Sequence, residues 1–253
     1  MDIFELVIVF AAGFLSAIIK NGVGVGSGIF LLPTLSMAFP VKIALGLGAP
    51  LMFASDLIGL RNYWREWFSL KEFLRLFLPT CVGLGIGTLL LSVIPGGAFR
   101  ICVGIFGMTY ALMLLFPKFG PFMAFKSMFG VMKSTSVNSQ ACFYGVLAGI
   151  STILAHAGGI VWSIYLMSRN MDRRMFVGSI ILMFSITNAY KVLAYLHLDF
   201  INVSMLMQLL LAIPVIWGGA CLGNLFNKRI NQDLFRKVVL CTIFIVSFML
   251  LFK

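Results

Sequence analysis

The sequence predicts an all-α polytopic membrane protein made of two inverted-topology repeats. Three observations support this prediction: a very apolar composition, apolar blocks of membrane-spanning length, and an internal duplication. Hydrophobic residues make up 61% and charged residues 11% of the 253 residues, and the mean hydropathy is +1.05. A soluble domain carries about a quarter charged residues, so this chain has too little polar sequence to cover its apolar surface in water.

Eight apolar blocks follow one another along the chain, at about 4–38, 43–61, 73–92, 98–116, 140–168, 175–196, 203–225 and 235–252. Six of them are close to the roughly 20 residues that a helix needs to cross a bilayer. The first and the fifth are too long for one crossing and too short for two. Each is interrupted near its middle, by KNGVGVGSG (20–28) and by AHAGG (155–159).

The chain matches itself when it is shifted by 132 residues. This shift places Gly13 on Gly145, Gly26 on Gly158, and Ser55-Asp56 on Thr187-Asn188. After a small gap, a shift of 136 residues places 99–116 on 235–252. Such self-similarity is the sign of an internal duplication. We therefore predict an N-terminal repeat at 1–116, a linker at 117–139 and a C-terminal repeat at 140–253.

The basic residues predict the topology of the two repeats. Nearly all Lys and Arg lie in 61–75, 117–139, 169–174 and 226–237, which the positive-inside rule places in the cytoplasm. Block 140–168 must then begin and end on the cytoplasmic side, so we predict a re-entrant, broken helical hairpin. By the duplication, 4–38 is the same kind of hairpin entered from outside.

Each repeat is then one broken hairpin followed by three transmembrane helices, and the two repeats are antiparallel. This is the arrangement of many secondary transporters. The alternative is a single tilted and kinked helix in place of each hairpin, because helices adapt to mismatch with the bilayer by tilting or kinking.

Several functional classes are not expected for this chain. The net charge of +11 is explained by the cytoplasmic loops, so no nucleic-acid partner is predicted. The five cysteines lack metal-site spacing and are interpreted as small hydrophobic residues. The acidic N-terminus MDIFEL is unlike the basic start of a signal peptide. No nucleophile elbow, metal cluster or P-loop is present, so we predict no enzyme activity, no cofactor and no metal.

The glycine-rich interruptions resemble a known family. GVGSGIFLLPTL (24–35) and AHAGGIVWSIYL (155–166), with the two-half layout around them, are similar to the sulfite exporter TauE/SafE family of membrane permeases. The resemblance implies a multi-pass plasma-membrane permease with the linker 117–139 in the cytoplasm. Its partners would be the lipid bilayer and a small anion such as sulfite, a sulfonate or a related organosulfur anion. A homo-oligomer stays open, and an anion channel is the alternative.

Three features depart from the family pattern as we read it. His156 stands where a small residue is more usual, and Asp56 stands where a small or neutral polar residue is more usual. Lys20-Asn21 ahead of the glycines is also uncommon. The identity of the substrate and the coupling ion are therefore not implied by the resemblance.

The chemistry of a broken helix predicts where an anion would bind. A helix that restarts inside the bilayer offers free N–H groups and the positive end of its dipole, and glycines let a ligand approach the backbone closely. Packing of small residues is the competing explanation for the glycines. The predicted substrate-binding residues are Lys20, Asn21, Gly24, Gly26, Ser27 and Gly28 in the first repeat, and Thr152, His156, Gly158, Gly159, Thr187 and Asn188 in the second.

The ionisable residues inside the blocks allow two interpretations each. Lys20 either faces the site or reaches a lipid head group. Asp56 pairs with Arg61 or Arg65, or else it loads a proton or holds Lys20. His156 either carries the coupling proton or serves as a packed, neutral residue. Lys191 either reaches outward or adds positive potential to the pathway.

Overall fold

The computed structural model describes residues 2–23, 26–116, 136–167, 169, 171–229 and 232–252. These residues form α-helices and the turns between them, without a strand. The first half contains α1 (Ile3–Val23), α2 (Ser27–Ser36), α3 (Val41–Asn62), α4 (Leu70–Val93) and α5 (Gly96–Leu115). The second half contains α7 (Val137–Ala155), α8 (Gly158–Met167), α9 (Arg173–His197), α10 (Val203–Leu210), α11 (Ile213–Arg229) and α12 (Gln232–Leu251). Six of the described helices are long and apolar enough to cross a membrane, and the bent pair α10–α11 would make a seventh. The predicted all-α membrane fold is confirmed.

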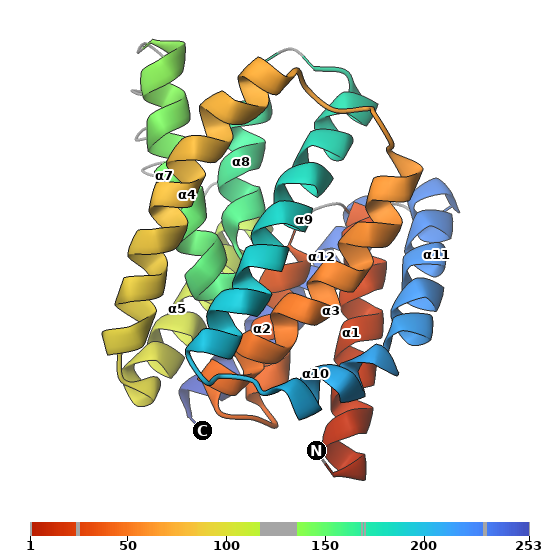
Figure 1. Ribbon diagram of the computed structural model, residues 1–253. Coiled ribbons are helices and arrows are strands. Elements are labelled where there is room, and N and C mark those ends of the chain that lie inside the picture. Colours follow the sequence, from red (N-terminus) through yellow and green to blue (C-terminus); the bar gives the residue numbers. More distant parts are fainter. Residues whose placement is uncertain are drawn as a thin grey trace.

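The first apolar block folds as a hairpin. In Figure 1, α1 rises from the lower end of the molecule, beside the N-terminus, and α2 returns toward that same end, where a short loop leads into α3. α2 has 10 residues. At 1.5 Å per residue it spans about 15 Å, half of a hydrocarbon core of about 30 Å. This arrangement favours the re-entrant segment that the sequence predicts over one kinked crossing.

The second block repeats this arrangement from the opposite end. α7 starts at the upper end of Figure 1 and descends, and α8 climbs back toward the start of α9. α8 also has 10 residues, and two residues separate it from α7. Both predicted interruptions therefore separate a long helix from a half-length one.

The two halves interlock instead of packing side by side. α4 of the first half packs against α7 of the second, and α1 packs in the same way against α11. α3 contacts α9, its counterpart under the 132-residue shift, and α5 contacts α12. In Figure 1, α1 and α3 run upward whereas α7 and α9 run downward. These pairings favour the inverted-repeat prediction. The repeat boundaries stay a prediction, and residues 117–135 of the linker lie outside the described residues.

The described basic segments lie at one end of the bundle. The α3–α4 loop, the start of α7 and the turn before α9 all lie at the upper end of Figure 1. The loop contains Arg65, and Arg174 in the first turn of α9 binds Glu66 across it, with 2.8 Å between Nη2 and Oε1. This hydrogen bond holds the pKa of Glu66 below its ordinary value. The positive-inside rule predicts that this end faces the cytoplasm.

Thiol labelling tests this topology. Single cysteines at Asp2, Pro40, Arg65 and Asp172, all exposed positions, are made in a chain whose five native cysteines, also exposed, are replaced by serine. A membrane-impermeant maleimide is expected to label positions 2 and 40 in intact cells, and positions 65 and 172 only after permeabilisation. Labelling of positions 2 and 40 from opposite sides would contradict the hairpin.

The block at 203–225, predicted as one crossing, is bent in the structure. It forms α10 and α11, which meet at a bend of 53°. Leu211 and Ala212 make turn hydrogen bonds to Gln208 and Leu209, of 3.2 and 3.0 Å, in place of continuing the α-helical pattern. Pro214 lies in the first turn of α11, where its missing N–H is tolerated, whereas a proline inside a continuous helix would remove a hydrogen bond. The block is still long and apolar enough for one crossing, but as a bent pair of helices in place of a continuous one.

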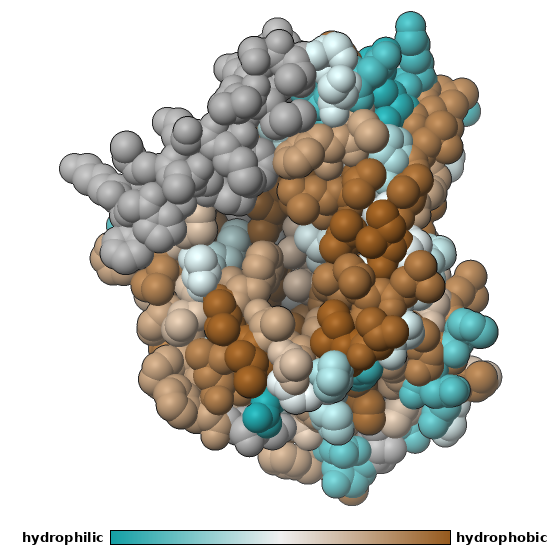
Figure 2. All heavy atoms as spheres, turned by 90° about the vertical axis from the view of Figure 1, so that its left-hand side faces the viewer, coloured by the Kyte–Doolittle hydropathy of each residue, from teal (hydrophilic) through white to brown (hydrophobic). Residues whose placement is uncertain are grey.

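The lateral surface of the bundle is apolar. In Figure 2, hydrophobic residues cover the middle of the visible face and hydrophilic residues gather toward its two ends. Leu78, Val82 and Leu89 on α4 are 60%, 57% and 71% exposed, and their spacing of four and seven places them on one face of the helix. Such a face is stable only against lipid or another apolar surface.

Candidate functional site

The first break exposes the start of a helix inside the bundle. Gly26 is the N-cap of α2 with φ of 95°, a left-handed conformation that favours glycine, and no side chain caps the helix. The first α-helical hydrogen bond runs from Phe30 N–H to the Gly26 carbonyl, at 3.1 Å. The N–H groups ahead of Phe30 point out of the start of the helix, as at any helix N-terminus. Ser27 and Gly28 are buried there, and Gly24 lies outside the described residues.

The second break is closed by a histidine in an unusual conformation. His156 follows the last turn of α7 with φ of 52°, and its N–H and that of Ala157 bond to the carbonyls of Thr152 and Ser151 at 3.0 and 3.1 Å. The bond from His156 to Thr152 is that of an αL C-terminal cap, in which glycine normally takes the left-handed position. A non-glycine residue there costs on the order of 1–3 kcal/mol, and such strain persists only where surrounding contacts impose it. The side chain of His156 supplies such contacts.

The two breaks meet in the interior of the bundle. A Cβ added to Gly28, at the start of α2, would lie 2.5 Å from His156 Cβ. A Cβ added to Gly48 on α3 would lie 2.8 Å from His156 Nε2. Both glycines are needed because His156 fills the space that a side chain would take. The two interruptions therefore lie in direct contact in the described part of the chain.

This contact makes Gly28 a sensitive position. Gly28→Ala is expected to lower the melting temperature in detergent and to reduce anion uptake, because the new methyl group has to displace the backbone of the second break. Gly85→Ala on α4 is the matched control, since nothing lies within 4 Å of its added Cβ. The control is expected to keep uptake and gain slightly in stability, because alanine favours helix over glycine by about 1 kcal/mol. Equal behaviour of the two variants would contradict the close contact.

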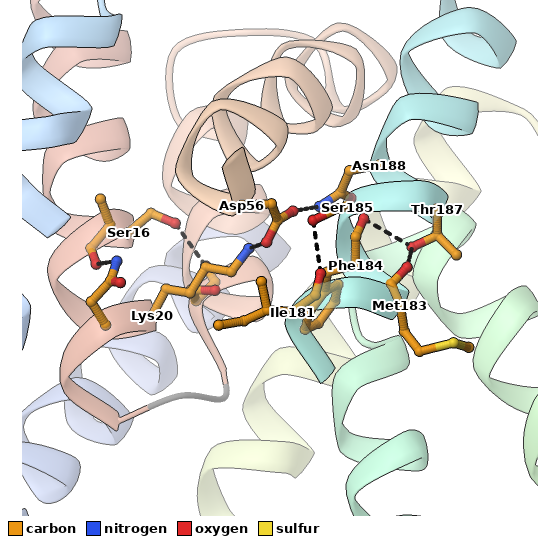
Figure 3. Close-up of polar contacts among 12 residues, drawn as sticks. Ser16, Lys20, Asp56, Ile181, Met183, Phe184, Ser185, Thr187 and Asn188 are labelled. Atoms are coloured by element: carbon orange, nitrogen blue, oxygen red, sulfur yellow. Dashed lines mark hydrogen bonds and ion pairs between the residues drawn. The ribbon is translucent and has the colours of Figure 1, made fainter. Parts of the chain in front are cut away.

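A buried ion pair lies beside the first break. Lys20 in the last turn of α1 pairs with Asp56 of α3, and Asn188 of α9 donates from Nδ2 to the second carboxylate oxygen of Asp56 at 2.6 Å (Figure 3). Lys20 is 8% exposed, and Asp56 and Asn188 are 0% exposed. The Lys20 ammonium also lies 4.9 Å from the centre of the Phe184 ring. The pairing of Asp56 with Arg61 or Arg65 was a wrong expectation, and Lys20 does not reach toward a head group.

Asp56 and Asn188 are equivalent positions under the 132-residue shift. Their hydrogen bond therefore joins α3 to its own counterpart at the point where the two halves are related. Asn188 Oδ1 and the neighbouring Ser55 hydroxyl are buried and have no hydrogen-bond partner among the described residues. Buried polar atoms are nearly always paired, so each of these two is left with the capacity for one further hydrogen bond.

A second buried cluster joins α9 to the second break. Lys191 is 0% exposed, and its ammonium lies 2.6 Å from His156 Nδ1 and 3.4 Å from both the carbonyl and the hydroxyl oxygen of Thr152. His156 Nε2 lies 3.2 Å from the carbonyl of Leu45. Because a carbonyl accepts but does not donate, Nε2 carries the hydrogen and Nδ1 accepts from Lys191. His156 is thereby assigned as the neutral Nε2–H tautomer.

The other predicted binding residues lie near these clusters but use their polar groups locally. Asn21 Nδ2 donates to the carbonyl of Ala17 at 2.9 Å, and Thr187 Oγ1 donates to that of Met183 at 2.8 Å. Cβ atoms added to Gly158 and Gly159 would press on Thr152 and on the Phe184 ring. These glycines therefore allow close packing around the second break, the explanation that competed with ligand binding.

Lys191 is the site residue whose position the sequence did not predict. The duplication gave no signal, because its counterpart under the 132-residue shift is Gly59. The available signal was its spacing: Lys191 follows Asn188 by three residues, so both lie on one face of α9. The alternative in which it reaches outward was wrong, and the one in which it adds positive charge inside agrees with its burial.

A separate polar cluster joins the start of α4 to the end of α8. Glu72 accepts hydrogen bonds of 2.5 Å from both Tyr165 Oη and Arg75 Nη1, and Arg169 lies 3.6 Å from it. The Arg169 guanidinium also stacks 4.3 Å from the centre of the Tyr165 ring. These residues lie at the end of the bundle that contains the basic segments.

The fold and the buried site together define a class of protein. Half-length helices that meet around buried charges, inside an apolar bundle, are characteristic of membrane transport proteins. The sulfite exporter TauE/SafE family matches residues 9–250, and the chain belongs to this family. It is thus a membrane transport protein of the sulfite and anion type, as the glycine-rich interruptions indicated. No curated protein and no solved structure matches the chain.

Proposed function

We propose that this protein is a secondary transporter of a small organosulfur anion, such as sulfite or a sulfonate. The substrate binds between the two helix breaks and is exposed alternately to the two sides of the membrane. The proposal assigns the anion to the space bounded by the start of α2, the second break and α9. Ser27 and Gly28 would offer N–H groups, and Lys191 and Thr152 would offer an ammonium and a hydroxyl.

The proposal rests on one observation: the buried lysines at the breaks outnumber the buried carboxylates. Among the described residues, the buried lysine and carboxylate side chains are Lys20, Asp56 and Lys191. Lys20 has a carboxylate partner, whereas Lys191 has none within 4 Å in the described part of the chain. A buried charge without a counter-ion is costly, and a bound anion removes that cost.

The burial of these groups favours a carrier over a channel. A conducting pore needs a continuous wet path along its polar groups. Asp56 and Lys191 are 0% exposed and His156 is 2% exposed, so the site is closed toward both sides in this state. A transporter must then open one side at a time.

The packing of the halves suggests which parts move. α7 and α8 pack together and α7 packs on α4, while α1 packs on α2 and on α11. The hairpin α7–α8 is thus held by α4 of the first half, and the hairpin α1–α2 by α11 of the second. These two groups of helices meet along α3 and α9. Rocking of one group against the other around the Asp56–Asn188 contact would expose the site alternately, the general behaviour of inverted repeats. Proton coupling through His156 or Asp56 stays a prediction.

Uptake into proteoliposomes tests the proposal. Purified protein is reconstituted, and entry of labelled sulfite, methanesulfonate, sulfate and a carboxylate is measured with and without the same anion trapped inside. Saturable uptake of an organosulfur anion, accelerated by trapped anion, is the expected result. Large single-channel currents without such counterflow would contradict a carrier, and an absence of anion uptake would contradict the proposed function.

A further inference from the structure

The number of charges at the two breaks limits the charge of the ligand. Two buried lysines face one buried carboxylate, and His156 is neutral in the assigned tautomer. Each break brings the C-terminus of one helix close to the N-terminus of the next, so their opposite partial charges of about one half nearly cancel. With both lysines protonated and Asp56 ionised, as in the anion-bound state, these side chains carry a net charge of one positive unit.

Asp56 acts on Lys20 as a bound anion would. Its carboxylate contacts the Lys20 ammonium and takes a hydrogen bond from Asn188, so both of its oxygens are engaged. The groups that face it are Lys20 from α1 and Lys191 from α9, with His156 beyond Lys191. Two further helices that pack on α3, α2 and α10, carry no ionisable side chain. The positive charge of Lys20 is thus already compensated within the protein.

Lys191 is left as the cation available to a ligand. Its partners are neutral: the Nδ1 atom of His156 and the two oxygens of Thr152. We propose that the site selects a monovalent oxyanion, such as a sulfonate or hydrogensulfite, which binds at Lys191 while Asp56 keeps Lys20 neutralised. A divalent anion of the same size would carry one uncompensated negative charge into the site. This inference rests on the proposed anion transport and adds its charge selectivity.

A charge series at Lys20 and Asp56 tests the inference. Methanesulfonate and sulfate are suitable probes because both are compact, tetrahedral oxyanions that differ in charge. Their uptake is compared at one pH near 7.5 for the unmodified chain, Asp56→Asn, Lys20→Met and the double variant Lys20→Met/Asp56→Asn. The ratio of the two uptakes is the readout, so a general loss of rate does not affect it.

The net charge of each variant predicts its ratio. The unmodified chain is expected to prefer methanesulfonate at least about tenfold, since tenfold corresponds to only about 1.4 kcal/mol of differential binding. Asp56→Asn leaves two positive charges and is expected to shift the ratio toward sulfate by a similar factor. Lys20→Met leaves none and should bind both anions weakly. The double variant restores one positive charge and should again prefer methanesulfonate.

A second measurement serves variants that fold but do not transport. The rise in melting temperature caused by each anion is compared in detergent, because a ligand stabilises the state that binds it. An equal preference in the unmodified chain, an unchanged ratio in Asp56→Asn, or a sulfate preference in the double variant would each overturn the inference. Such results would leave the proposed function intact, whereas an unmodified chain that transports no anion would overturn the proposed function itself.

Discussion

Lys191→Met is expected to abolish anion uptake and to leave the protein at least as stable as the unmodified chain. The ammonium of Lys191 is fully buried and its nearest partners are neutral, so it carries a desolvation cost that no carboxylate contact offsets. Methionine fills a similar volume without charge. Replacing a buried charge with an apolar side chain of similar volume is often neutral or stabilising.

The loss of uptake follows from the loss of the hydrogen bond between the Lys191 ammonium and the bound anion. A hydrogen bond to a charged group contributes about 1.5–3 kcal/mol, so its removal should weaken anion binding by roughly 10- to 150-fold. Uptake in proteoliposomes and the melting temperature in detergent are measured for the same preparations. Lys71→Met, at an exposed position in the first turn of α4, is the control and should change neither.

This pair of readouts separates binding from a structural role. If Lys191 served the fold, its replacement would lower the melting temperature, and uptake would fall as a consequence. If Lys191 binds the anion, uptake falls while the melting temperature holds or rises. A variant that keeps normal uptake would contradict the assigned role of Lys191.

The Lys20–Asp56 pair predicts a strong coupling in stability. Lys20→Met and Asp56→Asn are each expected to lower the free energy of unfolding by about 3–5 kcal/mol, because either one leaves a buried charge without its partner. The double variant removes both charges, so it should be far more stable than the sum of the single changes implies. Unfolding in a denaturing detergent, measured as a double-mutant cycle, gives the coupling energy.

A matched cycle at the protein surface provides the control. Arg174 and Glu66 also form an ion pair, but their side chains are 66% and 38% exposed. Exposed pairs contribute about 0–1 kcal/mol, so the coupling there should be small. Additive effects at Lys20 and Asp56, comparable to those at the surface pair, would mean that the inner pair is not buried as described.

Much of the fold could be predicted because it depends on properties that are local in sequence. The re-entrant blocks were predicted from their length and from the charges that follow them, and the structure has the half-length helices α2 and α8 at those places. The bend between α10 and α11 was missed because the block at 203–225 has the length and hydropathy of a straight crossing. Its turn depends on backbone geometry that composition does not show.

The site was only partly predictable because its contacts join distant segments. Lys20 and His156 stood out as polar residues at interruptions, so their place at the breaks followed from the sequence. The partner of Lys20 did not, because Asp56 lies 36 residues away and reaches it only when α1 and α3 are packed. Lys191 reaches His156 in the same way, across the contact between the second break and α9.

The measurement that tests the central claim most directly is equilibrium binding of labelled sulfite to the purified protein. The claim is that the two helix breaks form one anion site in which Lys191 is the binding cation. It predicts saturable binding of one anion per chain, retained in Lys71→Met and lost in Lys191→Met. Binding that is unchanged in Lys191→Met, or that saturates at two anions per chain, would contradict it.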